Sequence, residues 1–138
     1  MEQEIKQKLK EILSRNEDLR ERLERDPWAI SYNKRADMVL MGTAFPVGSF
    51  YYPVGGTGVM LRIDKNDKLY GFAIENAKSF IKQNPEMGIA LSFIIYPIRS
   101  FFVKLPLYFI AYHALKGFNT MKSILSVGDY VAGKASFV

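Results

Sequence analysis

The sequence contains no cysteine and only one histidine in its 138 residues. Without cysteine, the chain has no disulfide, no thiolate metal site and no cysteine nucleophile. Because His113 has no second histidine to join it, a two-histidine metal site and a metalloprotease signature are also excluded. We expect His113 to be partly buried or interfacial, and we predict no catalytic residue, no metal ligand and no cofactor.

Long hydrophobic runs and a secretion signal are also missing. The longest run without a charged residue in the C-terminal half is residues 87–98, which is 12 residues, whereas a spanning helix needs about 20. The first ten residues, MEQEIKQKLK, alternate charges and contain no apolar signal-peptide core. We therefore expect a cytoplasmic protein, with peripheral attachment to the inner face of the membrane as a further option.

Carboxylates are scarce in the C-terminal third. Residues 87–138 contain five lysines and arginines but only one acidic side chain, Asp129. Cations among aromatic residues attract anionic surfaces such as phospholipid headgroups or nucleic acid. Nucleic acid is not favoured, because the chain has no recognised groove-reading or single-strand motif. Ordinary solvated surface charge is the alternative explanation.

Residues 1–26 are rich in charge and carry apolar residues at heptad spacing. We predict one helix there, ended by Asp26 and Pro27. The stripe formed by these heptad positions, here called the seam, allows two interpretations. The helix either packs through it on the chain's own body, or it is an association helix in which the buried Asn16 selects the register. The seam residues are Leu9, Ile12, Asn16, Leu19 and Leu23.

Residues 27–84 are predicted to form an antiparallel β module with a short helix at its end. Short β-rich runs separated by glycine and proline begin at residue 37, and two or three hairpins are expected before residue 74. Residues 64–67, DKND, read as a tight turn, because Asp and Asn tolerate turn dihedrals. The resemblance of this turn to a calcium loop is weak, since Lys68 occupies a ligand position. A helix is expected to follow from Glu75.

Residues 85–138 are predicted to be an apolar, basic helical region with a tail. Asn84 and Pro85 form a helix start signal. Pro97 and Pro106 should break the apolar stretch 88–115, and Gly117 should end it. A short helix and a final strand over residues 130–138 are expected after that.

Three other patterns could suggest chemistry. The glycine run 55–58 lacks the spacing and the lysine of a phosphate loop, so we interpret it as a hairpin turn. Asp37 and Glu75 would be paired carboxylates only if folding brought them together. Trp28, Tyr32 and Arg35 could stack bases, but no surrounding motif supports that role.

The segment 35–82 resembles a family of small bacterial and archaeal domains of uncharacterised function. The resemblance rests on ADMVLM and on GVMLRIDKNDKLYGFAIENAKSFI, a strand, turn, strand and helix start. The chain departs from the pattern in its longer middle linker, GTAFPVGSFYYPVGGT, and in both flanking helical regions. The resemblance implies a compact antiparallel β module and no known active site.

Together these features predict an α+β protein that acts as a noncatalytic interaction or assembly protein. Its C-terminal half would dock on an anionic membrane surface or on a partner subunit. A soluble homo-oligomer with a regulatory, antitoxin-like role is the alternative, and a small enzyme of unknown reaction is the third. No small-molecule substrate is indicated. The expected contact residues are Ile94, Ile95, Arg99, Phe101, Phe102, Lys104 and Phe109.

Overall fold

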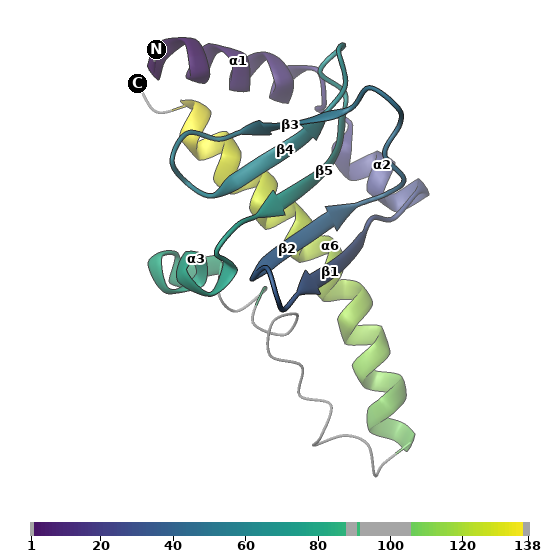
Figure 1. Cartoon of the computed structure of the whole chain (residues 1–138). Helices are drawn as coiled ribbons and strands as arrows, with labels where there is room; N and C mark the ends of the chain where they lie inside the picture. Colours follow the sequence, from purple (N-terminus) through teal and green to yellow (C-terminus); the bar gives the residue numbers. More distant parts are fainter. Residues whose placement is uncertain (1, 88–90, 92–105, 137–138) are drawn as a thin grey trace.

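The computed structural model describes residues 2–87, 91 and 106–136, and it confirms the predicted α+β fold class. Figure 1 shows one antiparallel sheet with helices packed against it. The elements are, in chain order, α1 (Glu2–Ser14), α2 (Leu19–Arg25), β1 (Ala29–Asn33), β2 (Met38–Gly42), β3 (Phe50–Pro53), β4 (Val59–Ile63), β5 (Leu69–Ile74), α3 (Ala77–Gln83) and α6 (Pro106–Ser136).

The five strands lie in the order β1-β2-β5-β4-β3, and every neighbouring pair is antiparallel. Three hairpins build the sheet, β1–β2, β3–β4 and β4–β5, and the pairing of β2 with β5 joins them. Phe72 lies at the centre, opposite Met41 on one side and Leu61 on the other. Strand β1 was not among the predicted strands, although its five residues alternate between exposed and half-buried.

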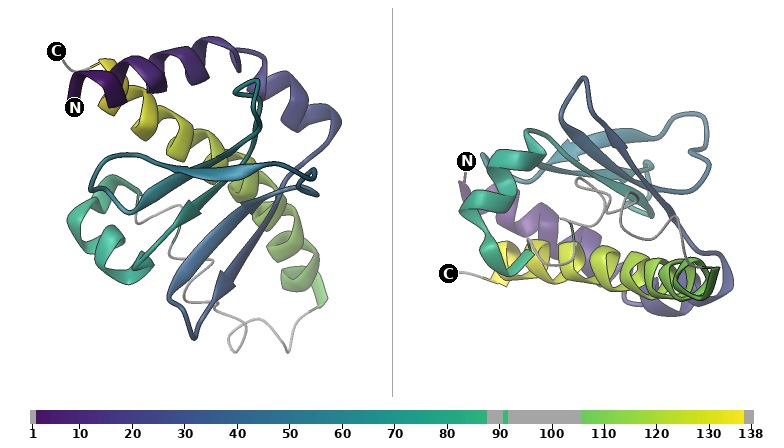
Figure 2. Two further views of the ribbon diagram at one scale, coloured as in Figure 1. Left: turned by 45° about the horizontal axis from the view of Figure 1, so that its top comes forward. Right: turned by 90° about the horizontal axis from the view of Figure 1, so that it is seen from below.

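Alternation along the strands gives the sheet one buried face. Val39, Leu61 and Phe72 are buried on this face. Helix α6 crosses it diagonally, and α1 lies beside the C-terminal end of α6 (Figure 2). The stripe from α6 that enters the same core consists of Ile124, Val127, Val131 and Ala135. Elements from all three predicted segments of the chain therefore share one hydrophobic core.

The prediction of one continuous helix over residues 1–26 is wrong. The chain breaks between α1 and α2 at residues 15–18, where Asn16 turns its side chain toward the sheet. The seam residues Leu9, Ile12 and Leu23 are buried in the chain's own core. The stripe that resembled a coiled-coil seam is thus already covered, which leaves it no surface for a second helix.

Two predictions for the C-terminal region are also wrong. Helix α6 continues through Gly117, and residues 130–136 are helical rather than a strand. Burial of Val127 and Val131 against the sheet accounts for this, because it outweighs the roughly 1 kcal/mol that a glycine costs inside a helix. At Gly128 an added Cβ would lie 3.9 Å from the ring of Phe72, which is an ordinary van der Waals contact, so the packing of α6 on the sheet does not depend on this glycine.

Among the described residues, no helix combines the length and the apolar composition that crossing a bilayer requires.

Candidate functional site

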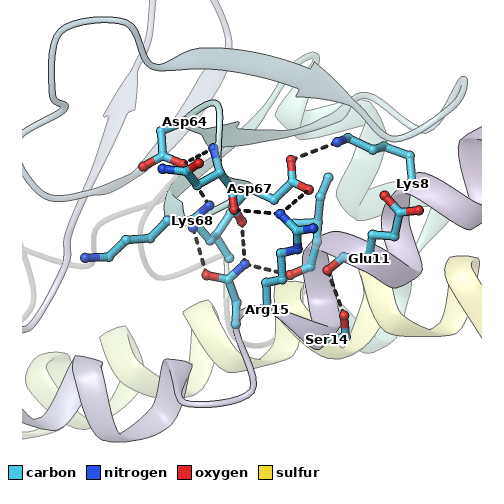
Figure 3. A network of polar contacts seen from close by, with 11 residues as sticks. Lys8, Glu11, Ser14, Arg15, Asp64, Asp67 and Lys68 are labelled. Atoms are coloured by element: carbon cyan, nitrogen blue, oxygen red, sulfur yellow. Dashed lines mark hydrogen bonds and ion pairs between the residues drawn. The ribbon is translucent and has the colours of Figure 1, made fainter.

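A network of polar groups joins α1, the α1–α2 link and the β4–β5 turn (Figure 3). At its centre is the buried amide of Asn16. Its nitrogen donates to the main-chain carbonyls of Ile12 at 2.6 Å and Asp67 at 2.7 Å. Its oxygen accepts from the Leu69 N–H at 2.8 Å and from the Arg22 guanidinium at 2.9 Å. All four hydrogen-bonding positions of the amide are used, so it is a fixed structural joint.

Asp67 supplies a buried carboxylate to this network. Its side chain is only 6% exposed, and Lys8 Nζ lies 2.8 Å from Oδ1 while an Arg15 nitrogen lies 3.6 Å from Oδ2. Its backbone has a φ of +64°, a left-handed conformation that Asp tolerates better than most residues. The carboxylate therefore pairs with two cations, one from α1 and one from the link that follows it, and fastens both to the turn.

Asp64 begins the same turn and shapes it as an Asx turn. Its carboxylate accepts hydrogen bonds from the N–H groups of Asn66 and Lys68 and from the hydroxyl of Tyr70. Burial acts to raise the pKa of Asp64, but these three donors together hold the pKa below its ordinary value. Burial and the bond to Asp64 raise the pKa of Tyr70 above its ordinary value. This turn is held by its own side chains, as the sequence predicts.

Asp37 and Glu75 lie at the same end of the sheet, but they make different contacts. The Asp37 carboxylate accepts the Tyr32 hydroxyl at 2.7 Å and the backbone N–H of Lys78, and its carbonyl accepts the N–H of Ala77. It thus caps the first turn of α3 from the β1–β2 hairpin. Glu75 is exposed, and its own N–H bonds to Gly58. The structure gives Asp37 a structural role.

A groove of about 740 Å³ lies between α2 and α6. Leu23, Trp28 and Ile124 are buried at its floor, and Met121 and Leu125 are half-buried on its wall. This volume lies in the range of ligand-binding clefts, which are usually apolar with a few polar groups. The complete lining is Arg20, Leu23, Glu24, Pro27, Trp28, Thr120, Met121, Lys122, Ile124, Leu125, Ser126 and Asp129.

Four charged side chains stand around this groove. Arg20 and Glu24 come from α2, and Lys122 and Asp129 come from α6. All four are exposed, and none takes part in an ion pair in the described parts of the chain. The groove therefore offers an apolar floor, and its edge carries charges of both signs that form no ion pair with a described residue. The described residues contain no cluster of three or more histidines and carboxylates that would suit a metal ion.

Most of the predicted contact residues lie outside the described residues. These are Ile94, Ile95, Arg99, Phe101, Phe102 and Lys104. Phe109 belongs to α6, of which the structure describes the backbone at that point. Sequence reasoning missed the groove, although its one signal was visible: the chain's single tryptophan, Trp28, directly follows the helix-ending Pro27.

Searches against protein-family models, curated proteins and solved structures find no match to this chain. The resemblance of residues 35–82 to a family of small uncharacterised domains therefore stays a prediction.

Proposed function

We propose that this protein is a noncatalytic interaction protein that docks a partner chain along α6 and in the groove between α6 and α2. The single observation that carries the proposal is the groove itself, an apolar floor bordered by charges of both signs. By contrast, the buried polar groups Asn16 and Asp67 are fully engaged in joining elements of the fold. We therefore assign the groove to binding rather than to catalysis.

The shape of the groove favours a helical segment as the occupant. Its walls are two helices, and residues 120–129 of α6 give it a length of about 14 Å, since an α-helix rises 1.5 Å per residue. A partner helix with an apolar stripe could fill the floor with residues at i, i+3 and i+4. Acidic and basic residues beside that stripe would meet Lys122 and Asp129. A segment with charges of both signs fits this rim better than a purely anionic or cationic one.

The sequence of the first half of α6 extends the same argument. Residues 106–119, PLYFIAYHALKGFN, contain one charged residue, Lys116. Figure 1 shows this half of α6 continuing past the strands of the sheet. A helix that is apolar on every side is normally covered by other groups. A partner subunit that lies along α6 would cover both this half and the groove.

Site-specific photo-crosslinking tests the proposal. Lys122 at the groove edge is replaced by p-benzoylphenylalanine in the full chain, and Lys10, exposed on α1, is replaced in the same way as the control. We expect a discrete protein adduct at position 122 that is absent at position 10. The further variant Leu125→Glu, which places a charge on the groove wall, should remove the adduct.

The identity of the adduct separates the alternatives. The soluble homo-oligomer would be supported if mass spectrometry identified the adduct as two crosslinked copies of this chain and light scattering showed a discrete dimer. An adduct with lipid would place α6 on the membrane. Identical adducts at positions 122 and 10, or none at position 122, would contradict docking in the groove.

A further inference from the structure

The loop between β2 and β3 carries an unusual concentration of exposed apolar side chains. Within the described part of the chain, the exposed large hydrophobic residues are Phe45 at 40%, Val47 at full exposure and Phe50 at 46%. All three fall within six consecutive positions. Exposed apolar clusters of this kind mark contacts with protein or membrane. The loop is separate from the groove, because Phe45 packs on the sheet face opposite the one that α6 covers.

The loop is held in a defined shape before it meets any partner. The ring of Phe45 lies over Gly42 and Gly71, where an added Cβ would come within 2.8 Å and 3.1 Å of it. The Arg62 guanidinium stacks on Phe45 at 4.8 Å and on Tyr51 at 4.7 Å. These contacts fix the base of the loop against the sheet, so little conformational entropy is lost when its tip binds.

The tip is a tight turn that presents Val47 outward. Ser49 donates from both its N–H and its hydroxyl to the carbonyl of Pro46, and Gly48 adopts a φ of +89°. Arg62 Nε donates to the Ser49 hydroxyl at 2.9 Å, which ties the turn to β4. Val47 thus stands at the apex of a braced, convex turn.

Cations outnumber carboxylates in and beside this loop, with Arg62, Lys65 and Lys68 against Asp64 and Asp67. Residues 38–63 contain no carboxylate and one cation, Arg62. The Thr43 N–H donates to the Tyr70 carbonyl, which places the base of the loop beside the start of β5 and the turn that carries the exposed Lys65 and Lys68. The carboxylates of that turn, Asp64 and Asp67, are already engaged by donors of the chain itself.

We propose that the β2–β3 loop is a membrane-contact loop that inserts Val47, flanked by Phe45 and Phe50, into the interface of an anionic bilayer. Arg62, Lys65 and Lys68 would lie near the lipid phosphates. A lipid surface fits this loop better than a protein does. A specific protein interface buries about 800 Å² on each side, whereas a bilayer accommodates a single convex apolar tip.

The absence of native cysteine provides a direct test in the full chain. Val47→Cys is labelled with the environment-sensitive dye NBD, and Gln3→Cys on the exposed side of α1 is labelled as the control. Vesicles of phosphatidylcholine with about 30% phosphatidylserine should blue-shift and brighten the dye at position 47 several-fold, and should leave the dye at position 3 unchanged. Neutral vesicles should give a much smaller change in the dye. High salt should reverse the change that anionic vesicles cause.

Substitution of the tip gives the second test. Val47→Asp removes the apolar apex at a fully exposed position, so folding should be unaffected. It should lower vesicle binding about tenfold, whereas Gln3→Asp, with the same charge change, should not. An unresponsive dye at position 47, or equal responses to neutral and anionic vesicles, would overturn the proposal. If Val47→Asp abolished a discrete oligomer instead of vesicle binding, the loop would be a protein contact. None of these results depends on the groove, so the two proposals fail separately.

Discussion

The side-chain amide of Asn16 donates a 2.7 Å hydrogen bond to the main-chain carbonyl of Asp67, and this bond ties the link between two helices to the turn between two strands. Asp67 in turn binds Lys8 of α1 through its carboxylate. Asn16 and Asp67 are 51 positions apart in the chain, yet the buried amide of one and the main-chain carbonyl of the other satisfy each other. They connect the N-terminal helices to the sheet and so fix one side of the core.

Removal of the Asn16 amide should be strongly destabilising. Asn16→Ala leaves the buried N–H of Leu69 and the carbonyls of Ile12 and Asp67 without this partner. We expect a loss of about 2–4 kcal/mol in the free energy of unfolding, measured by urea denaturation. Ser14→Ala, at an exposed hydroxyl nearby on α1, is the control and should cost well under about 1 kcal/mol. Equal effects of the two changes would contradict the central role of Asn16.

Variants of Asp67 should separate its charge from its backbone conformation. Asp67→Gly removes the ion pairs with Lys8 and Arg15 but tolerates the positive φ, whereas Asp67→Ala also strains the backbone. We therefore expect Asp67→Ala to be less stable than Asp67→Gly by about 1 kcal/mol. Thermal and urea unfolding of both proteins measure the difference. An alanine variant as stable as the glycine variant would show that the left-handed conformation imposes no cost.

The acid stability of the protein should depend in part on Asp64. The pKa of its carboxyl is lower in the folded chain than its ordinary value, so ionised Asp64 stabilises the fold above the unfolded pKa of about 3.9. That contribution is lost as the pH falls through the folded pKa. Asp64→Asn keeps a side-chain oxygen for the turn but removes the charge, so its stability deficit should be present near neutral pH and shrink below about pH 4.

Urea unfolding of both proteins from about pH 7 to pH 2 measures this effect. Because Asp64 is half-exposed, the deficit should stay under about 1 kcal/mol. Tyr70→Phe removes one of the donors to Asp64. Introduced into the wild-type chain, it should reduce the part of the free energy of unfolding that depends on pH. A deficit that is the same at every pH would mean that the charge of Asp64 makes no contribution.

Gly71 in β5 and Gly56 in the β3–β4 turn should differ sharply in their tolerance of a methyl group. A Cβ at Gly71 would lie 2.3 Å from the carbonyl oxygen of Met41, which is a backbone atom and cannot move freely. Gly71→Ala should therefore cost about 1–3 kcal/mol or more. Gly56→Ala is the matched control, because no atom of the described residues lies within 4 Å of its ideal Cβ position. Thermal unfolding compares the two, and a tolerated alanine at position 71 would contradict the close approach of these strands.

Several features of this protein follow from the sequence alone. The tight turn at residues 64–67 was predicted from its Asp and Asn residues, and the Asp64 side chain accepts hydrogen bonds from the backbone N–H groups of Asn66 and Lys68 within this segment. The alternation of Val59, Leu61 and Ile63 likewise predicted one buried face of a strand. These are local properties, set by the stereochemistry of neighbouring residues.

The tertiary structure decided what covers each apolar stripe. The heptad spacing of Leu9, Ile12 and Leu23 fits a coiled coil and a helix packed on a sheet equally well, because both bury one side of a helix. The groove and the braced loop at Val47 also depend on elements distant in sequence, such as Trp28 with Ile124 and Phe45 with Gly71. The sequence determines which residues need burial, but long-range contacts decide which surfaces bury them and which are left for a partner, since periodicity carries no information about the opposing surface.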